Sequence, residues 1–412
     1  MRRVAVVHDM GAASVLDVAA AFEGLATPVF VCPESRTMEQ PRELMDEFGI
    51  LCDIAGLDTR EAAARLRACA PDAIVTYNDY QLERTAELAA ELGLPFHSPG
   101  VVRALTRKHL QRELLNACGA SAVPTRLVGD QATALRAFEE IGGPAVLKPE
   151  VGTGSRSTYR IRTAEELRDA CAEIFPPTGG ATHEDFVLER EIPGGSGKSP
   201  WGDYVSVESA VQGGRVEHIA VTGKFPLAPP FRESGSFLPA ALATRDREAV
   251  LDLATRALKG LGVSLGVCHT EIKLSPRGPQ VIEVNGRLGG LVNDLLTRTG
   301  DLNAVEIAAR LALGEKDPPA GIDAWEPDRV SFVFAKVPPM EATQLLSLDG
   351  ADDLQTMPEI SRVMVQQEPG ARIDWRRGRL GHTLVCYGAT RTHDDLARLL
   401  TRINNTVQVT YK

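Results

Sequence analysis

The segments that decide the fold are HTEIK at 269–273 and VIEVNGRLGG at 281–290. Polar and apolar residues alternate in each, which is typical of a half-buried β-strand. Turn-forming residues separate the two segments. With Arg277 at the centre of the turn, Glu271 lies directly opposite Glu283. The sequence therefore predicts an antiparallel hairpin that carries two facing carboxylates.

The predicted hairpin has one polar and one apolar face, because successive side chains of a strand point to opposite sides. The polar face carries His269, Glu271, Glu283, Asn285 and Arg287. The apolar face carries Thr270, Ile272, Ile282 and Val284, which we expect to pack on a core.

Two opposed carboxylates repel each other unless something compensates their charge. The simplest candidate is a divalent cation held by Glu271, Glu283 and Asn285. Oxygen ligands favour Mg²⁺, with Mn²⁺ as the alternative, and Mg²⁺ commonly shares the phosphates of a nucleotide. A solvated hairpin is the other interpretation, but the following Gly289 and Gly290 could also give backbone N–H groups to an anion.

A second candidate phosphate site follows a predicted strand that ends at Lys148. The loop after it contains Gly152, Gly154 and Ser155, which let backbone N–H groups approach phosphate oxygens. Lys108 lies on the preceding predicted helix. Taken singly, each lysine is better interpreted as a solvated surface charge.

The run GGSGKS at 194–199 resembles a phosphate-binding P-loop. That pattern requires glycine where Ile192 stands, and Pro200 blocks the helix that would follow. We interpret the run as a substrate or covering loop instead.

Composition excludes several classes of protein. The chain has 412 residues, 43% hydrophobic and 24% charged, with a net charge of −10, which is typical of a multidomain globular protein. The acidic balance argues against nucleic-acid or anionic-membrane binding. No apolar run approaches the roughly 20 residues of a membrane span, and we expect no signal peptide. The seven cysteines form no C-x-x-C pair, which favours a reduced, cytoplasmic protein.

These elements occur in the order typical of one family. Lys108, Lys148 with its glycine loop, a strand ending near Ile192, and the acid hairpin resemble the ATP-grasp superfamily of carboxylate–amine ligases. Within it, the chain is most similar to the bacterial L-amino-acid ligases (dipeptide synthetases). The resemblance covers essentially the whole chain.

The resemblance implies a mixed α/β and α+β fold. Strands and helices alternate in residues 1–98, which match a Rossmann-like pre-ATP-grasp domain. Residues 99–185 match the N-terminal part of the ATP-grasp fold with its lid, and 186–318 match the part that holds ATP and metal. Residues 319–412 match a small C-terminal subdomain.

The resemblance also implies roles for single residues. The residues that would bind ATP are Lys108, Lys148, Gly152, Gly154, Ser155, Glu189, Glu191, Ile192 and Asp203. Among these, Glu189, Glu191 and Ile192 would take the adenine. Asp203 would hold the ribose, where the superfamily usually has Glu. Two Mg²⁺ ions would be held by Glu271, Glu283 and Asn285, and Arg287 would stabilise the transferring phosphoryl group and the tetrahedral state.

The substrate contacts are the least specific part of this comparison. The residues expected nearest the substrates are Arg232, Glu233, His269, Gly289, Gly290 and Leu291. Arg232 could pair with a carboxylate and Glu233 with an amino group, or both could belong to a solvated loop. Leu291 would border the acceptor pocket, and His269 is read as a hydrogen-bonded structural residue in preference to a base.

The sequence thus predicts an ATP-dependent ligase that joins an amino-acid carboxylate to an amine through an acyl phosphate, with release of ADP and phosphate. Small-molecule substrates are the expected partners, and a homodimer is left open. The alternatives are an ATP-grasp ligase or carboxylase with a non-amino-acid substrate and a catalytically silent ATP-binding protein. Intact acids and Arg287 argue against the silent protein.

Overall fold

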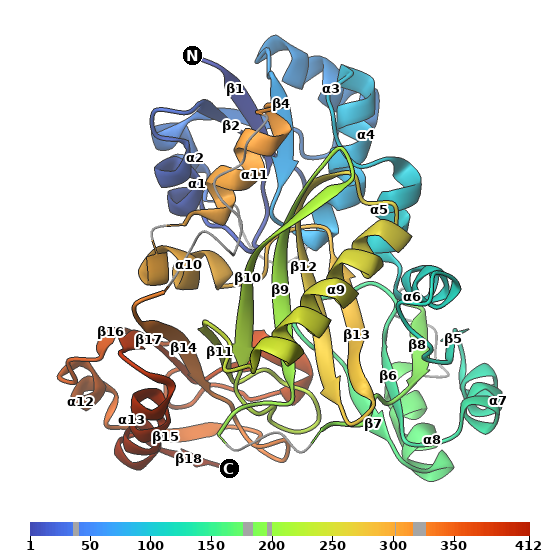
Figure 1. Ribbon diagram of the computed structural model, residues 1–412, viewed down its shortest axis with the longest axis vertical. Helices are drawn as coiled ribbons and strands as arrows, with labels where there is room; N and C mark the ends of the chain where they lie inside the picture. Colours follow the sequence, from blue (N-terminus) through green and yellow to red (C-terminus); the bar gives the residue numbers. More distant parts are fainter. Residues whose placement is uncertain (36–40, 176–183, 196–199, 301, 316–326) are drawn as a thin grey trace.

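The computed structural model describes residues 1–35, 41–175, 184–195, 200–300, 302–315 and 327–412 (Figure 1). These residues contain a parallel sheet, two antiparallel sheets and a two-stranded ribbon. Residues 196–199 of the glycine- and lysine-rich run, and the predicted domain boundary at 318, lie outside the described residues.

The N-terminal part is a parallel sheet packed against helices, as the alternating pattern predicts. Its strands lie in the order β3–β2–β1–β4, namely β3 (Ile50–Asp53), β2 (Thr27–Cys32), β1 (Arg3–Val7) and β4 (Ala73–Thr76). Its helices are α1 (Val15–Phe22), α2 (Arg42–Phe48), α3 (Thr59–Ala68) and α4 (Leu82–Leu92). Capping boxes at Ser14 and Asp58 fix the starts of α1 and α3. Side chains of β1 enter two separate cores, one on each face of the sheet, so the strand interior is fully buried.

A second sheet, which we call the lid sheet, follows α5 (Pro99–Thr106) and α6 (Lys108–Ala117). It is antiparallel, with the order β5 (Thr125–Val128), β8 (Phe186–Arg190), β6 (Ala145–Pro149) and β7 (Tyr159–Ile161). Helices α7 (Gln131–Ile141) and α8 (Ala164–Ile174) pack into its hydrophobic core. Because β8 lies inside this sheet, the lid sheet extends past position 185.

The third sheet is antiparallel and has eight strands. In order these are β13 (Gly278–Asn285), β12 (Leu265–Ser275), β9 (Tyr204–Gln212), β10 (Arg215–Lys224), β11 (Gly235–Leu238), β14 (Val330–Lys336), β17 (Leu384–Thr390) and β16 (Ile360–Val365). Helix α9 (Thr244–Gly260) packs on the strands of the first half (Figure 1). The C-terminal strands thus continue the sheet that contains the acid hairpin.

The rest of the C-terminal part covers the end of this sheet. It consists of α12 (Ala351–Gln355), α13 (His393–Thr406), the ribbon of β15 (Leu345–Asp349) and β18 (Gln408–Tyr411), and the 3₁₀ segment η3 (Trp375–Gly381). Apolar side chains of α13 pack beneath β14 and β17 in one shared core.

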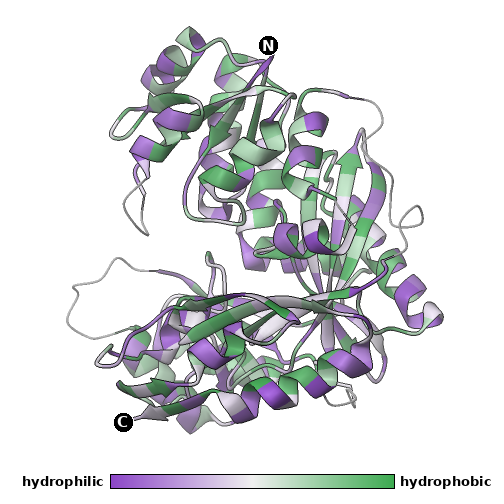
Figure 2. Cartoon of the chain, turned by 90° about the vertical axis from the view of Figure 1, so that its left-hand side faces the viewer, coloured by the Kyte–Doolittle hydropathy of each residue, from purple (hydrophilic) through white to green (hydrophobic). Residues whose placement is uncertain are grey.

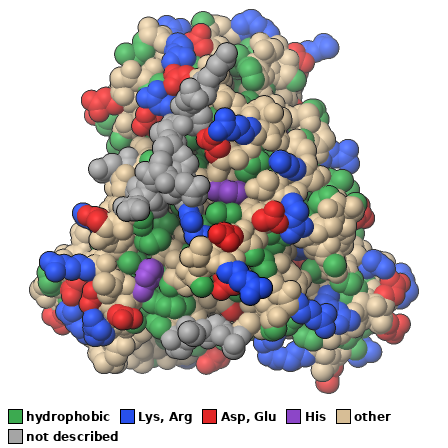
Figure 3. All heavy atoms as spheres, viewed as in Figure 1, with side chains coloured by type: hydrophobic (Ala, Val, Ile, Leu, Met, Phe, Trp, Pro, Cys, Tyr) green, Lys and Arg blue, Asp and Glu red, His purple; other side chains and the backbone are tan. Residues whose placement is uncertain are grey.

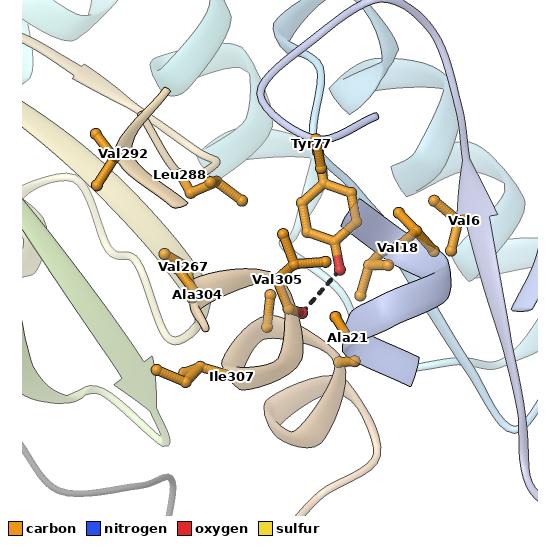
Figure 4. Packing of buried hydrophobic residues seen from close by; sticks show 14 of the residues in the cluster. Val6, Val18, Ala21, Tyr77, Val267, Leu288, Val292, Ala304, Val305 and Ile307 are labelled. Carbon is orange, nitrogen blue, oxygen red and sulfur yellow. Dashed lines mark hydrogen bonds between the residues drawn. The ribbon is translucent and has the colours of Figure 1, made fainter. Parts of the chain in front are cut away.

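Helices α10 (Val292–Gly300) and α11 (Ala304–Ala312) join the N-terminal domain to the large sheet. One continuous core contains Val18 of α1, Val305 of α11 and Leu288 after the hairpin (Figure 4). The Tyr77 hydroxyl donates to the Val305 carbonyl at 3.0 Å. This packing brings the carboxyl end of β4, and the short η1 helix (Asp79–Gln81) after it, toward the acid hairpin.

Hydropathy and charge are distributed over the molecule as follows. Hydrophobic residues concentrate in the sheets, and the helices also carry hydrophilic residues (Figure 2). On the face drawn in Figure 3, acidic and basic side chains are interspersed and form no broad basic patch. No helix in the described ranges is long and apolar enough to cross a membrane.

Candidate active site

The acid hairpin forms from β12 and β13 with the predicted central pairing. Glu271 lies opposite Glu283, and His269 lies opposite Asn285. The predicted turn centre is wrong, because Ser275 pairs with Gly278 and a tight turn joins them. A β-bulge between Glu271 and its neighbour Ile272 restores the predicted pairing of the two acids.

The bulge changes the direction of one side chain. Ile272 pairs with Val281 and Glu271 with Glu283, so Ile282 is the extra residue on β13. The sequence predicts that Ile282 packs on the core, but in the structure it is half-buried and lines a cavity. The cavity therefore gains an apolar wall directly beside the acids.

This cavity has a volume of about 310 Å³ and lies where all parts of the chain meet. The predicted site residues that line it are Lys108, Lys148, Gly152, Gly154, Ser155, Glu189, Glu191, Ile192, Glu233, His269, Glu271, Glu283, Arg287 and Gly290. The predicted residues that do not line it are Asp203, Arg232, Asn285, Gly289 and Leu291. The N-terminal domain contributes Asp79 and Tyr80, and η3 contributes Arg377 and Arg379, none of which the sequence analysis identified.

Lysines and glutamates are paired at the lid side of the cavity. Lys148 Nζ lies 2.6 Å from Glu189 Oε1, and Arg112 lies 3.4 Å from the other oxygen of that carboxylate. Burial opposes ionisation of Glu189, but the two cations outweigh it and lower its pKa. Glu189 was predicted as an adenine contact, but its carboxylate is engaged by these cations.

The glycine loop is held in a strained backbone conformation. Ser155 and Ser157 have φ values of 58° and 46°, which are uncommon for residues other than glycine. Lys108 Nζ donates to the Gly152 carbonyl at 2.7 Å and lies 3.9 Å from Glu283 Oε2. Lys108 therefore links the glycine loop to the acid hairpin, and strain of this kind is typical of ligand-binding loops.

A fully buried glutamate supports the polar face of the hairpin. Glu208 of β9 lies opposite His269 and accepts hydrogen bonds from His269 Nδ1 and, at 3.0 Å, from the Gly289 N–H. His269 Nε2 lies 3.4 Å from Glu271 Oε1. Burial alone would lower the pKa of His269, but Glu208 and Glu271 raise it to about 9. His269 is thus hydrogen-bonded as predicted, whereas the Gly289 N–H meets a protein carboxylate and is not free for a bound anion.

Arg287 is oriented by the N-terminal domain. Its guanidinium group donates to Asp79 Oδ2, with Nε at 2.8 Å, and also to the Leu288 carbonyl at 2.9 Å. Nη2 lies 3.4 Å from the hydroxyl of Thr153 in the glycine loop. Arg287 therefore connects three parts of the chain at the cavity.

The predicted substrate residues divide into two groups. Glu233 lies 3.4 Å from Lys224, which together with Arg379 and His269 lowers the Glu233 pKa to about 2 despite its burial. Arg232 was predicted to meet a substrate carboxylate, but it is buried and its Nε donates to the Pro229 carbonyl at 2.7 Å.

Three other residues predicted for the site do not line the cavity. Leu291 packs against the core shared with the N-terminal domain and does not border the cavity as predicted. Asp203 pairs with Lys273 at 2.6 Å, and Lys273, not Asp203, lines the cavity. Asn285 is buried, and its side chain contributes to lowering the pKa of Glu283.

The acids fit a cation that is shared with a ligand. No group of three His, Cys, Asp or Glu side chains in the described ranges is arranged to hold a metal. Glu271 and Glu283 alone would leave most coordination positions open, which suits Mg²⁺ bound together with phosphate oxygens. Burial would raise the pKa of Glu283, but Lys108, Lys148 and Arg287 keep it below its usual value, so an ionised carboxylate is available.

Known proteins are similar to this chain in sequence and in architecture. The ATP-grasp domain family matches residues 141–294. Carnosine synthase 1 of Homo sapiens is 30% identical over 247 residues, which are 55% of this chain and 28% of that protein. Alanine–anticapsin ligase of Bacillus subtilis (strain 168) is 28% identical over 231 residues, which are 53% of this chain and 49% of that protein. The chain thus spans about half or less of the length of these two relatives.

A solved structure extends the comparison to the whole chain. The crystal structure of an L-amino acid ligase from Bacillus licheniformis has a TM-score of 0.77 and 19% identity, and covers 100% of this chain and 99% of that one. The predicted fold is therefore confirmed. This chain carries an ATP-grasp domain and has the ATP-grasp fold.

Proposed function

We propose that this protein is an ATP-dependent ligase that forms an amide bond between the carboxylate of an amino acid and an amine. The observation that carries the proposal is the single cavity lined by Glu271, Glu283, Lys108, Lys148 and Arg287. Cations for phosphates and acids for a metal thus surround the same space. One of the relatives named above, alanine–anticapsin ligase, supports an amino acid as a substrate.

We infer that ATP lies between the lid sheet and the hairpin. Its phosphates would face the glycine loop, Lys108 and Lys148. The Glu191 N–H donates a hydrogen bond to the Pro144 carbonyl at 3.0 Å and is therefore already used. An adenine edge would bind the Glu191 carbonyl and the Ile192 N–H instead. Asp203 would not contact the ribose itself. It would instead position Lys273, which lines the cavity and could contact the ribose.

Mg²⁺ held by Glu271 and Glu283 would neutralise phosphate charge, and Asn285, which does not line the cavity, would support Glu283 from behind. In the first step a carboxylate oxygen of the substrate attacks the γ-phosphorus, and the bond to the leaving ADP breaks. Arg287 is placed to stabilise charge on the transferring group, while Glu233 is placed to hold the ammonium group of that amino acid.

The second step uses the acyl phosphate. The amine nitrogen attacks the acyl carbon and loses a proton, and the C–O bond to phosphate breaks. Arg287 can stabilise the oxyanion of the tetrahedral state. The covering glycine loop and η3 would exclude water, which would otherwise hydrolyse the intermediate.

The test is phosphate release from Mg-ATP with a matrix of paired amino acids, followed by mass spectrometry of the products. The expected result is release that requires two amino acids and a product equal to their summed mass minus water. Release with single carboxylates or with bicarbonate alone, and no dipeptide from any pair, would contradict the proposal. A cytoplasmic location and a homodimer stay predictions.

A further inference from the structure

Most cations that line the cavity already have acceptors. Lys148, Arg156, Lys224, Lys273 and Arg287 face carboxylates, whereas Lys108 and Arg190 donate to backbone carbonyls. The guanidinium groups of Arg377 and Arg379 make no hydrogen bond or ion pair with any residue that the structure describes. Both belong to η3.

Of these two arginines, Arg379 is the one that lies against Gly290, which follows the acid hairpin. A Cβ atom built on Gly290 would be 2.0 Å from Arg379 Nη1, so the guanidinium group occupies the space that the missing side chain leaves. Arg379 is half-buried and near enough to Glu233 to lower its pKa. Arg377, in contrast, is exposed.

The backbone of η3 is fixed against the glycine loop, which makes the position of Arg379 definite. Arg379 N–H donates to the Gly154 carbonyl at 3.0 Å, and Ser157 N–H donates to the Arg376 carbonyl at 2.9 Å. Trp375 packs edge-on against Tyr159 of the lid sheet, with ring centroids 5.1 Å apart. The guanidinium group thus projects from an anchored backbone.

We propose that Arg379 binds the carboxylate of the acceptor amino acid, and so selects amines that carry a carboxylate next to the amino group. The inference rests on the proposed ligase function. A guanidinium group matches a carboxylate through two parallel charge-assisted hydrogen bonds. A substrate carboxylate would supply the acceptor that the described protein residues do not.

The charges in the cavity distinguish the acceptor from the other ligands. In the proposed complex, Lys108 and Lys148 face the phosphates, Arg287 faces the donor carboxylate, and Glu233 faces the donor ammonium group. The acceptor carboxylate is the remaining anionic group, and Arg379 lies over Gly290, near enough to Glu233 to act on its charge. An amine held by Arg379 would therefore approach the acyl carbon from the side of η3.

The test compares Arg379→Gln with Arg372→Gln as the control, because Arg372 is exposed and does not line the cavity, and with Arg379→Lys as the conservative variant. Glutamine removes the guanidinium group and keeps the backbone bond to Gly154. Each variant is assayed with the best acceptor amino acid of the wild type and with the α-carboxamide of that amino acid. Melting temperatures and MgADP affinities are measured alongside.

The expected result is an acceptor KM raised roughly ten- to a hundredfold in Arg379→Gln, with partial recovery in Arg379→Lys and little change in Arg372→Gln. Activity with the carboxamide should be equal in wild type and Arg379→Gln, and MgADP affinity should be unchanged.

Three outcomes overturn the inference. Equal losses with the amino acid and its carboxamide would show that the carboxylate is not what Arg379 binds. A weakened MgADP affinity would assign the guanidinium group to a phosphate. In both cases the ligase function stands. A wild type that ligates no amino-acid pair would remove the proposed function and the inference together.

Discussion

The acid hairpin and η3 line the same cavity but reach it in different ways. Glu271 and Glu283 are twelve residues apart in the chain and meet through local antiparallel pairing. Arg379 reaches the same space from far along the chain, through contacts with the glycine loop at Gly154. The hairpin is therefore locally encoded, whereas the position of η3 depends on how the C-terminal part and the lid sheet pack together.

The two regions also differ in their charges. The cations around the acid hairpin have protein acceptors, and Glu208 and His269 form a buried, hydrogen-bonded pair beneath it. In η3, Arg377 and Arg379 have no acceptor among the described residues. This difference suggests that the hairpin provides chemistry common to such ligases and that η3 provides selection among substrates.

The largest effect is expected at the hairpin. Glu283→Gln keeps the shape of the side chain but removes the charge that would hold the metal. Phosphate release from Mg-ATP should fall on the order of 10³-fold, because stabilisation of the transferring phosphoryl group is lost. Glu140→Gln is the control, since Glu140 is an exposed partner of Arg126 on the lid surface. Turnover within a few-fold of wild type would refute the role of Glu283.

The next effect concerns acid stability beside η3. Burial, together with the nearby Arg379 and Arg232, lowers the pKa of His382 to about 4, although its bond to the Glu233 carbonyl opposes the shift. A neutral folded histidine contributes stability above its ordinary pKa of 6.5, and that contribution is lost as pH falls toward 4. The loss should reach about 3 kcal/mol, measured by urea unfolding at about pH 7.5, 6 and 4.5.

In His382→Gln, the free energy of unfolding should fall less steeply as the pH is lowered from about 6.5 to 4. His393→Gln is the matched control, because His393 also contacts a backbone carbonyl, that of Pro239, at 2.9 Å. If the free energy of unfolding of His382→Gln depends on pH as steeply as that of the wild type, His382 does not cause the loss of stability at acid pH.

A smaller effect is expected where the N-terminal domain meets the hairpin. Asp79→Asn removes the charge that orients Arg287, so the guanidinium group should lose its fixed position. We expect kcat to fall roughly ten- to a hundredfold while the KM for ATP changes little. Asp394→Asn, an exposed substitution in the first turn of α13, is the control. A raised KM for ATP with an unchanged kcat would contradict this positioning role.

The smallest effect tests the anchoring of η3. Gly378 has a φ of 55°, and a Cβ atom there would lie 2.0 Å from the Gly154 carbonyl oxygen. Gly378→Ala should cost about 1 kcal/mol from the backbone conformation and should also displace η3, which would raise the acceptor KM several-fold. Steady-state kinetics and thermal unfolding measure the two effects separately.

Gly370→Ala is the control that separates the effect of backbone strain from the effect of the contact between η3 and the glycine loop. Gly370 also has a positive φ, 97°, but a Cβ atom there meets nothing within 4 Å. This variant should lose similar stability and keep the wild-type acceptor KM. If both variants change the acceptor KM equally, the contact between η3 and the glycine loop does not position the acceptor site.

Much of the site could be predicted from local pattern. Alternation of polar and apolar residues in two nearby segments predicts the hairpin and the pairing of Glu271 with Glu283. The bulge at Ile282 could not be predicted, because it follows from a tight turn whose length the pattern does not fix. A similar alternation in β9, where polar residues include Ser206 and Glu208, could have located the buried glutamate.

The errors share one physical cause. Arg232 and Leu291 lie in connecting segments, where side-chain direction follows no period. Arg232 turns into its own loop, which a bridge between Ala228 and Arg232 closes, and Leu291 turns to the core between domains. Asp79 was missed because its partner Arg287 lies 208 residues away.

The sequence by itself determined the acid hairpin, through short-range periodicity, and the lysines and glycines that line the cavity. It indicated the ATP-grasp architecture because its motifs, taken in order, resemble those of a known family. Only the tertiary structure decided that Asp79 orients Arg287, that Glu208 supports His269, and that Arg379 reaches the space over Gly290. Those contacts join segments that are far apart in the chain, so they depend on the packing of domains and cannot be predicted from local sequence.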